Sequence, residues 1–384
     1  MNYFSSNFKL GILGGGQLGK MLLYNTRKFD IFTSVLDASE EAPCKIASNE
    51  FHLGDLMDYD AVYNFGKHVD VLTIEIENVN VDALEALEKA GIKVYPASKT
   101  LRTIQNKAKQ KLFYRDNDIP TSVFTRFAYL SEIEDAVGNG GLEFPFVWKA
   151  AQFGYDGNGV KVVRNLSDLE GLPKGECIAE DLIPFKNELA VIVARRVSGE
   201  TKTYPVVEME FHPEANQVEY VICPARISIE VAKKAEEVAL KASKAFKHVG
   251  LLAVEMFQTN DDKILVNEVA PRPHNSGHQT IEASYTSQFE QHIRAILDLP
   301  LGRTDSKVGG VMVNLVGAEG YTGNVVYQNI EDIMNMDGVT PHIYGKKQTR
   351  PFRKMGHVTI VNEDLNEARR IAEEVKKSIK VISQ

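Results

Sequence analysis

The chain is poor in cysteine, with three residues, Cys44, Cys177 and Cys223, far apart in the sequence. Because no two of them form a C-x-x-C pair, neither a disulfide framework nor a zinc site is expected. Long apolar runs are also lacking: no stretch of about 18 apolar residues occurs, which excludes a membrane-spanning helix. The first ten residues, "MNYFSSNFKL", have no apolar signal core, so we expect a cytoplasmic protein without a membrane partner.

An excess of positive charge is lacking as well. Lysine and arginine total 44 against 52 aspartate and glutamate residues, which gives a formal net charge of -8. Binding of nucleic acid needs a basic surface, so this balance argues against nucleic acid as the main partner. A small anionic ligand needs only a local basic cluster and is not excluded. The 384 residues, 43% of them hydrophobic, suffice for two or three domains with a sizeable core.

The order of predicted elements divides the chain into three parts. In residues 1–110, β-rich apolar runs alternate with amphipathic segments, which predicts a Rossmann-like α/β domain around a parallel sheet. One helix over 98–117 is expected to carry the chain out of this domain. Residues 111–298 hold longer strands and a hairpin signal, as in an α+β domain. Residues 299–384 predict a small β-rich C-terminal domain that ends in a helix.

A glycine-rich turn follows the first predicted strand. Gly14, Gly16 and Gly19 fit the spacing G-x-G-x-x-G, and Asp37 ends the next apolar run. A strand–turn–helix unit of this kind points free N–H groups and the positive end of a helix at an anion, which is typical of dinucleotide sites. The pattern alone also fits another phosphate ester, or a tight turn without a ligand.

A second glycine-rich stretch, "WKAAQFGYDGNGVKVV", lies between two predicted strands. Lys149 ends the first strand, and Gly154, Gly157 and Gly159 precede the second. Such a connection can cover a polyphosphate with main-chain donors while the lysine neutralises its charge. It is not a P-loop, because it lacks G-K-[ST] and a helix directly after it. The alternative is a glycine-rich hairpin beside a chance lysine.

Two carboxylates interrupt apolar strands near the end of the middle part. Glu255 lies in "AVEMF" and Glu268 in "LVNEVA", and the turn "TNDDK" joins them. Across a hairpin, these carboxylates and the Asn267 amide could hold Mg²⁺, which prefers oxygen ligands and shares them with phosphates. The solvated face of a half-exposed hairpin would show the same alternation, so both interpretations stay open.

Polar and basic residues follow in two clusters. "APRPHNSGH" carries Arg272, a donor for phosphate or carboxylate, and His274, which can relay a proton or bind a ligand. Near the end, "RPFRKMGHV" brings Arg353, Lys354 and His357 together without an acidic residue. This second cluster predicts either an anion site or a solvated basic turn.

Six segments, in chain order, resemble the N5-carboxyaminoimidazole ribonucleotide synthase family of ATP-grasp enzymes: "GGGQLGKM", "TIEIEN", "KAAQFGYDGNG", "AVEMF", "VNEVAPRPHNSGH" and "RKMGH". The resemblance covers nearly the whole chain. It implies a Rossmann-like N-terminal (pre-ATP-grasp) domain, a central ATP-grasp domain and a small C-terminal domain. It also implies that ATP lies between the halves of the central domain, whereas the first glycine loop helps to hold a ribonucleotide monophosphate.

The resemblance implies a reaction of ATP, bicarbonate and 5-aminoimidazole ribonucleotide. The products are N5-carboxyaminoimidazole ribonucleotide, ADP and phosphate, in de novo purine biosynthesis. Bicarbonate attacks the γ-phosphate, and the resulting carboxyphosphate, or CO₂ released from it, carboxylates the exocyclic amine. Such a reaction needs Mg²⁺ and cations to offset phosphate charge and a lid to exclude water. A homodimer is also implied, and attachment to a downstream mutase is left undecided.

By the same resemblance, residues at matching positions take three kinds of role. Those expected to bind ATP are Lys107, Lys149, Gly154, Tyr155, Asp156, Gly157, Asn158, Gly159, Val160, Glu180, Asp181, Leu182, Ile183, Glu188, Asn267 and Glu268. Mg²⁺ is expected on Glu255 and Glu268. Those expected to bind the ribonucleotide and bicarbonate are Gly16, Gln17, Leu18, Glu75, Tyr155, Arg272, His274, Asn275, Ser276 and Arg353. Those expected to act in catalysis are Asp156, Arg272, His274 and Lys354, with Asp156 and His274 handling protons.

Two positions depart from the family pattern. Lys107 stands where many relatives carry arginine, which keeps the charge but loses the fork of donors. The family often has a histidine near the nucleotide. Either Phe211 or His212 stands at that position here, depending on one residue of register. Three rival functions stay open: another ATP-grasp ligase, such as formate-dependent glycinamide ribonucleotide transformylase or biotin carboxylase; an NAD-dependent dehydrogenase built on the first glycine loop; and a non-catalytic nucleotide-binding subunit.

Overall fold

The structure is a computed structural model that describes residues 2–152, 159–213, 215 and 217–384. Five residues with predicted roles lie outside the described part: Gly154, Tyr155, Asp156, Gly157 and Asn158. Their roles therefore stay predictions.

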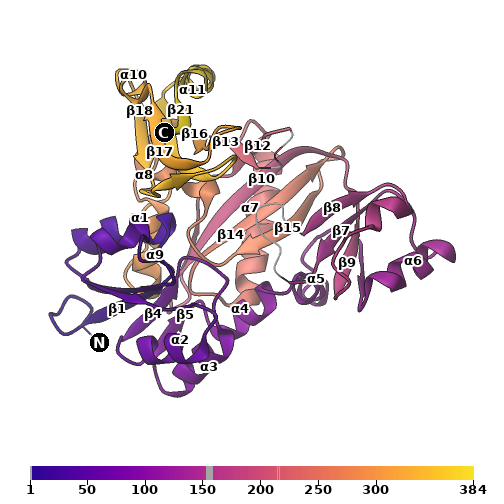
Figure 1. Cartoon of the computed structure of the whole chain (residues 1–384), viewed down its shortest axis with the longest axis horizontal. Helices are drawn as coiled ribbons and strands as arrows, with labels where there is room; N and C mark the ends of the chain where they lie inside the picture. Colours follow the sequence, from indigo (N-terminus) through magenta and orange to yellow (C-terminus); the bar gives the residue numbers. More distant parts are fainter. Residues whose placement is uncertain (1, 153–158, 214, 216) are drawn as a thin grey trace.

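The N-terminal part is built around a parallel sheet of five strands in the order β3-β2-β1-β4-β5 (Figure 1, indigo). Its strands are β1 (Lys9–Leu13), β2 (Phe32–Asp37), β3 (Glu50–Leu53), β4 (Val71–Ile74) and β5 (Lys93–Tyr95). Between them lie α1 (Gln17–Lys28), the 3-10 turn η1 (Pro43–Ile46), α2 (Tyr59–Gly66) and α3 (Val81–Lys89). The alternation of strand and helix confirms the predicted α/β fold class of this part.

The two faces of this sheet are covered from different parts of the chain. Helices α2 and α3 pack on one face, where Val62, Leu84 and Leu87 join the core of Leu13, Leu36 and Ile74. The other face is covered by α1 together with α9 (Gln288–Ile296), which lies far away in the sequence. In Figure 1, α9 lies next to α1. A late helix thus completes the N-terminal core.

The single helix predicted over 98–117 is wrong in one respect, because the structure has two helices there. They are α4 (Ser98–Ile104) and α5 (Lys107–Asp116). Asn106 has extended backbone angles, φ -126° and ψ 110°, and its side chain accepts a hydrogen bond from the Lys109 N–H at 2.8 Å. An N-cap of this kind starts a new helix with Lys107 as its first residue.

The central part contains two sheets. The smaller one has four antiparallel strands in the order β6-β9-β7-β8. Its elements are β6 (Phe124–Phe127), α6 (Leu130–Gly138), β7 (Phe146–Ala150), β8 (Val160–Val163), the 3-10 turn η2 (Leu166–Leu169) and β9 (Cys177–Asp181). Strands β7 and β8 flank the second glycine-rich stretch, with Lys149 opposite Val160, so the two strands predicted on either side of it are confirmed.

The larger sheet has nine strands and runs on into the C-terminal part. Its main path is β15-β14-β10-β12-β13-β16-β20-β18, and β11 pairs with β10. The bounds are β10 (Phe185–Arg195), β11 (Thr201–Thr203), β12 (Val207–Phe211), β13 (Val218–Cys223), β14 (Gly250–Thr259), β15 (Ile264–Ala270), β16 (Gly309–Val316), β18 (Val339–Ile343) and β20 (Lys354–Asn362). The pairing of β13 with β16 joins the two parts, and in Figure 1 strands β10, β14 and β15 cross the middle of the molecule.

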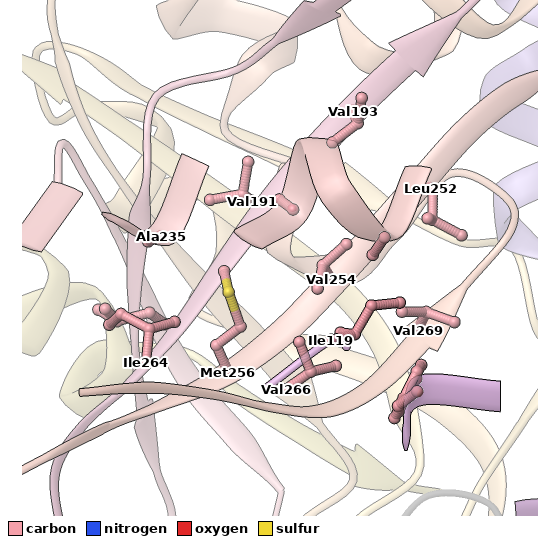
Figure 2. Close-up of a cluster of buried hydrophobic side chains, with 14 of the residues drawn as sticks. Ile119, Val191, Val193, Ala235, Leu252, Val254, Met256, Ile264, Val266 and Val269 are labelled. Carbon is pink, nitrogen blue, oxygen red and sulfur yellow. The ribbon is translucent and has the colours of Figure 1, made fainter. Parts of the chain in front are cut away.

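One face of the large sheet carries the main hydrophobic core. The amphipathic helix α7 (Ile229–Phe246) packs there with Val231, Ala235 and Ala239. Figure 2 shows side chains of β10, β14 and β15, such as Val191, Val254 and Val266, that point into this cluster together with Ile119. Burial of these apolar side chains fixes β14 and β15 at the centre of the molecule.

The remaining elements follow β15: the first two precede residue 299, and the others belong to the C-terminal part. They are η3 (Asn275–Gly277), α8 (Thr280–Ala283), β17 (Gly323–Gln328), α10 (Ile330–Met334), β19 (Gln348–Thr349), α11 (Leu365–Ser378) and β21 (Lys380–Ser383). Helix α11 buries Ala368, Ala372 and Val375 against β16 and β20. Within the described residues, no helix combines the length and the apolar character that a bilayer crossing requires.

The contact between Gly250 and His292 joins α9 to the large sheet. His292 is fully buried, its Nδ1 accepts the Leu251 N–H at 3.3 Å, and its Nε2 lies 2.9 Å from the Thr73 hydroxyl of β4. Gly250 has φ +102°, and a Cβ there would lie 2.8 Å from His292 Cε1.

We expect Gly250→Ala to lower the free energy of unfolding by about 3 kcal/mol, because the new methyl group adds overpacking to backbone strain. Denaturant unfolding followed by circular dichroism measures this change. Gly91→Ala is the matched control, since Gly91 has φ +92° but nothing within 4 Å of a Cβ. Equal losses in the two variants would show that the contact with His292 contributes nothing.

Candidate active site

Two carboxylates of the central hairpin face each other. Glu255 on β14 and Glu268 on β15 are direct cross-strand partners, next to a bulge in the pairing. The Glu255 side chain is only 16% exposed, which excludes a solvated hairpin face for this residue. Burial raises the pKa of Glu255 above its usual value, and the charges of Glu268 and Glu188 raise it further. A carboxyl group held in this way indicates a functional site.

A third carboxylate comes from the adjacent strand. Glu188 lies on β10, where its Cα partner is Phe257 of β14. Burial raises the pKa of Glu188 to about 7, and the charge of Lys149 opposes the shift. Glu188 thus lies on the strand next to Glu255, and its negative charge is one reason why the pKa of Glu255 is raised.

The donor set at the carboxylate pair suits Mg²⁺ only if other ligands are shared with a substrate. Among the residues that the structure describes, no group of three or more His, Cys, Asp and Glu side chains could hold a metal ion. Mg²⁺, however, is usually bound by one or two carboxylates that share it with substrate phosphates. Glu255 and Glu268, as paired oxygen donors with mutual repulsion, fit that pattern.

Lys107 connects helix α5 to the carboxylates. Its Nζ lies 2.5 Å from Glu268 Oε2. The charge of Lys107 is the main reason why the pKa of Glu268 is held below its usual value. Because Asn106 starts a new helix at this point, the break between α4 and α5 places Lys107 at the site.

Lys149 lies on β7 between two acceptors. Its Nζ donates to Asn267 Oδ1 at 2.9 Å and lies 3.3 Å from the Glu180 carboxylate. Lys111 of α5 approaches the same carboxylate to 3.1 Å, and the side chains of Lys111 and Glu180 are 2% and 4% exposed. Burial lowers the pKa of Lys111 to about 8. The sequence reasoning missed Lys111, although its position one helical turn after Lys107 was an available signal.

The Glu180 carboxylate is paired with two lysines of the protein itself. Burial would raise its pKa, but Lys149 and Lys111 outweigh burial and hold the pKa below its usual value. Its carboxylate therefore neutralises two lysines, and its backbone lies between β6 and β7 in the small sheet. Asp181 ends β9, and the Leu182 side chain after it is 38% exposed. The prediction that residues 180–183 hold adenine stays a prediction.

The first glycine loop is filled by carboxylates. Glu75, directly after β4, accepts the N–H groups of Gly16 and Gly19 at 3.2 and 3.0 Å. Asp37 accepts the N–H of Gly15 at 2.6 Å. Glu75 is 8% exposed, and burial raises its pKa above the usual value. Donors that would meet a pyrophosphate are thus occupied by the protein itself, which argues against the dinucleotide interpretation.

The loop after β15 carries Arg272 and His274, and it contacts the N-terminal part through Arg272. Arg272 Nε donates to Glu77 Oε2 at 2.8 Å, in the segment after β4. His274 Nε2 lies 3.2 Å from Glu255 Oε1, and His274 Nδ1 accepts the Ser276 N–H at 3.3 Å. Because Nδ1 is an acceptor, the proton of the neutral ring is on Nε2 and points to Glu255. The loop therefore joins the carboxylate pair to residues of the N-terminal sheet.

Three other predicted substrate contacts differ in what they can offer. Asn275 exchanges side-chain hydrogen bonds of 3.0 and 2.9 Å with Asn314 of β16. Leu18 is 8% exposed and packs in the core, so that it can offer a ligand only its backbone. Gln17 opens α1 and is half-buried. Their contacts with a substrate stay predictions.

The basic C-terminal cluster is divided by the fold. Lys354 begins β20, and its charge partly offsets the raised pKa of Glu255. Arg353 donates to the Gln348 carbonyl at 2.6 Å. His357, by contrast, is fully buried and stacks on His342 with ring centroids 4.4 Å apart. The expectation that His357 shares the anion site is wrong, because its ring is fully buried between His278 and His342, and burial lowers its pKa well below the usual value.

The choice between Phe211 and His212 stays open. Phe211 ends β12 and packs against Met209 and Val221. His212 Nδ1 accepts the Ala215 N–H at 3.2 Å. Neither environment identifies a nucleotide contact.

Three family models match successive parts of the chain. They are the ribonucleotide synthetase preATP-grasp domain over residues 8–105, the ATP-grasp domain over 112–289 and the phosphoribosylaminoimidazole carboxylase C-terminal domain over 310–371. The fold and these matches define an ATP-grasp protein of the ribonucleotide synthetase type, and they confirm the predicted fold class.

Known proteins of similar sequence and structure narrow this class. The N5-carboxyaminoimidazole ribonucleotide synthase of Bacillus subtilis (strain 168) is 37% identical over 362 residues, 93% of this chain and 92% of that protein. The crystal structure of the synthetase from Thermotoga maritima has a TM-score of 0.90 and 42% identity, and the match covers 98% of this chain and 100% of that one. The Aspergillus clavatus enzyme, solved in complex with ADP and 5-aminoimidazole ribonucleotide, has a TM-score of 0.88 and 34% identity over 97% of this chain and 98% of that one. The chain belongs to the N5-carboxyaminoimidazole ribonucleotide synthase family.

Proposed function

We propose that this protein carboxylates 5-aminoimidazole ribonucleotide with bicarbonate and ATP, giving N5-carboxyaminoimidazole ribonucleotide, ADP and phosphate. One observation carries the proposal. Glu255 faces Glu268, which is paired with Lys107, and Glu255 Oε1 also lies 3.2 Å from His274 Nε2. Groups suited to a nucleotide and groups suited to a second substrate therefore meet at one carboxylate. The A. clavatus relative, solved in complex with ADP and 5-aminoimidazole ribonucleotide, supports the choice of these two ligands.

On the nucleotide side, the chain supplies cations for the triphosphate. Lys107, beside Glu268, and Lys149, beside Asn267, would neutralise phosphate oxygens as the γ-phosphoryl group is transferred to bicarbonate. Glu255 and Glu268 would hold Mg²⁺. When bound, the ion would offset the negative charge of the phosphates and polarise the γ-phosphate for attack by bicarbonate. Residues 154–160, of which Gly159 and Val160 are described, would cover the phosphates and exclude water from the carboxyphosphate.

On the ribonucleotide side, the chain offers donors and a proton carrier. His274 presents its Nε2 proton towards Glu255, which suits it to handle a proton during carboxylation of the amine, and Asp156 is proposed as its partner in this role. Arg272 is held by Glu77 and would orient bicarbonate or carboxyphosphate. Because Glu75 and Asp37 occupy the glycine-loop donors, the phosphate would rely on Arg353, Lys354 and the remaining N–H groups at the start of α1.

The same proposal includes the setting of the enzyme. A net charge of -8 is consistent with small-molecule substrates and with no nucleic-acid partner. We place the enzyme in the cytoplasm, as a homodimer that acts in purine biosynthesis.

The function is tested by ADP formation from ATP, Mg²⁺ and bicarbonate, with and without 5-aminoimidazole ribonucleotide. We expect this ribonucleotide to stimulate ADP formation and EDTA to abolish it, since phosphoryl transfer depends on the metal. Stimulation by glycinamide ribonucleotide with formate instead would assign the chain to the other ATP-grasp ligase. Tight binding of NADH, lost in Gly16→Val, would support the dehydrogenase, but the occupied donors of the glycine loop predict that no such binding is found.

A further inference from the structure

Gln288 holds the backbone of His274 from both sides. It is the first residue of α9 and is fully buried. Its Oε1 accepts the His274 N–H at 2.8 Å, and its Nε2 donates to the His274 carbonyl at 2.7 Å. The side-chain amide therefore pairs with the His274 backbone as a neighbouring strand would.

The orientation of the Gln288 amide is fixed by its partners. Its oxygen must face the His274 N–H and its nitrogen the carbonyl, so the second N–H points to His278 Nδ1 at 3.1 Å. His278 is then neutral with its proton on Nε2, in agreement with burial, which lowers its pKa well below the usual value. At the start of the helix, the Gln288 N–H donates to the Thr280 hydroxyl at 2.9 Å. Gln288 can thus adopt one arrangement only.

Helix α9 connects Gln288, and the two hydrogen bonds by which it clamps the His274 backbone, to the core of the N-terminal sheet. Its residues Phe289 and Ile293 pack with Leu10 and Ile12 in the core of the N-terminal sheet. The peptide groups on both sides of the His274 Cα are consequently fixed relative to that sheet. The imidazole, which is further restrained by Ser276, is directed at Glu255.

We propose that Gln288 is a positioning residue, which sets the direction of the His274 imidazole towards Glu255 and the reacting groups. The proposal rests on the proposed function, in which His274 handles a proton. Gln288 touches no substrate, and its effect acts through His274. Because a misplacement of about 1 Å can cost about a hundredfold in rate, loss of this clamp should affect turnover more than nucleotide binding.

The same helix provides a matched control. Gln291, also fully buried, holds the backbone of Gly302 in the same way: its Oε1 accepts the Gly302 N–H at 2.8 Å, and its Nε2 donates to the Gly302 carbonyl at 3.1 Å. Gly302 lies in the connection to β16, where its carbonyl also accepts from Lys202 and no residue of the proposed site is involved.

The test compares Gln288→Glu with Gln291→Glu. Each change replaces the donor of a buried clamp by an acceptor, so that both should destabilise the fold to a similar extent. We expect Gln288→Glu to lower kcat by about 10- to 100-fold with KM for ATP within about twofold of the wild type. Gln291→Glu should leave kcat within about twofold. Gln288→Met and Gln291→Met repeat the comparison without a new charge, in case the first pair folds poorly.

A second readout does not depend on turnover. In ¹⁵N-histidine-labelled protein, the His274 imidazole signals, identified with His274→Gln, should shift in the Gln288 variants and not in the Gln291 variants. Equal kcat values and unshifted His274 signals in the two sets would overturn the proposal. If the wild type itself shows no turnover that depends on 5-aminoimidazole ribonucleotide, the proposed function fails, and the imidazole signals still decide whether Gln288 positions His274.

Discussion

Glu268→Gln is expected to lower kcat for ATP turnover at least about a thousandfold, which corresponds to about 4 kcal/mol of transition-state stabilisation. The amide keeps the shape of the side chain but loses the charge that would bind Mg²⁺. It also releases Lys107, whose Nζ lies 2.5 Å from the carboxylate. Steady-state ADP formation at saturating ATP and Mg²⁺ measures the loss. The effect is large because phosphoryl transfer depends almost entirely on positioning and charge compensation.

Asp262→Asn is the matched control for this variant. Asp262 lies in the turn of the same hairpin and pairs with Lys186 at 2.8 Å, and its side chain is 45% exposed, against 42% for Glu268. Asparagine tolerates the φ of +59° at this position. We expect Asp262→Asn to keep kcat within about twofold of the wild type, since an exposed pair contributes little. Wild-type turnover in Glu268→Gln would contradict the assignment of the metal site.

Glu180→Gln is expected to lower the free energy of unfolding by about 3–5 kcal/mol, because it leaves two buried ammonium groups without their counter-charge. Glu180 lies 3.1 Å from Lys111 and 3.3 Å from Lys149, and it accepts the Ser122 hydroxyl at 2.7 Å. Glutamine can keep the last contact but cannot neutralise a lysine. Chemical denaturation monitored by fluorescence of Trp148, which lies on the neighbouring strand β7, measures the loss.

Glu176→Gln provides the comparison on the same segment of chain. Glu176 directly precedes β9 and pairs with Arg126 at 2.6 Å, with its side chain 27% exposed. Its loss should cost no more than about 1 kcal/mol. Adding Lys111→Met to Glu180→Gln should recover part of the stability, because one unpaired charge is removed. Equal losses of unfolding free energy in Glu180→Gln and Glu176→Gln would contradict the burial of the Glu180, Lys111 and Lys149 charges. The same holds if Lys111→Met restores no stability to Glu180→Gln.

Local periodicity was sufficient for most of the secondary structure. The alternation of apolar and amphipathic runs predicted the parallel N-terminal sheet, and the two strands around "TNDDK" were confirmed as β14 and β15. The prediction failed at Asn106, because residues of ordinary helix propensity continue on both sides and the cap depends on a side-chain hydrogen bond. The covering of the N-terminal sheet by α9 could not be predicted, since an amphipathic pattern shows that a helix has a buried face but not what covers it.

The sequence by itself determined the family, the fold class and the residue types of the candidate site, because motifs such as "NEVAPRPHNSGH" and the glycine spacings are local features of the chain. The tertiary structure alone decided which groups pair: Lys107 with Glu268, Glu180 with Lys111, Glu75 with the glycine-loop N–H groups, and Gln288 with His274. The physical reason is that ion pairing and desolvation act over a few ångströms. Their strength is therefore set by which distant segments the fold brings together, and it cannot be derived from spacing along the chain.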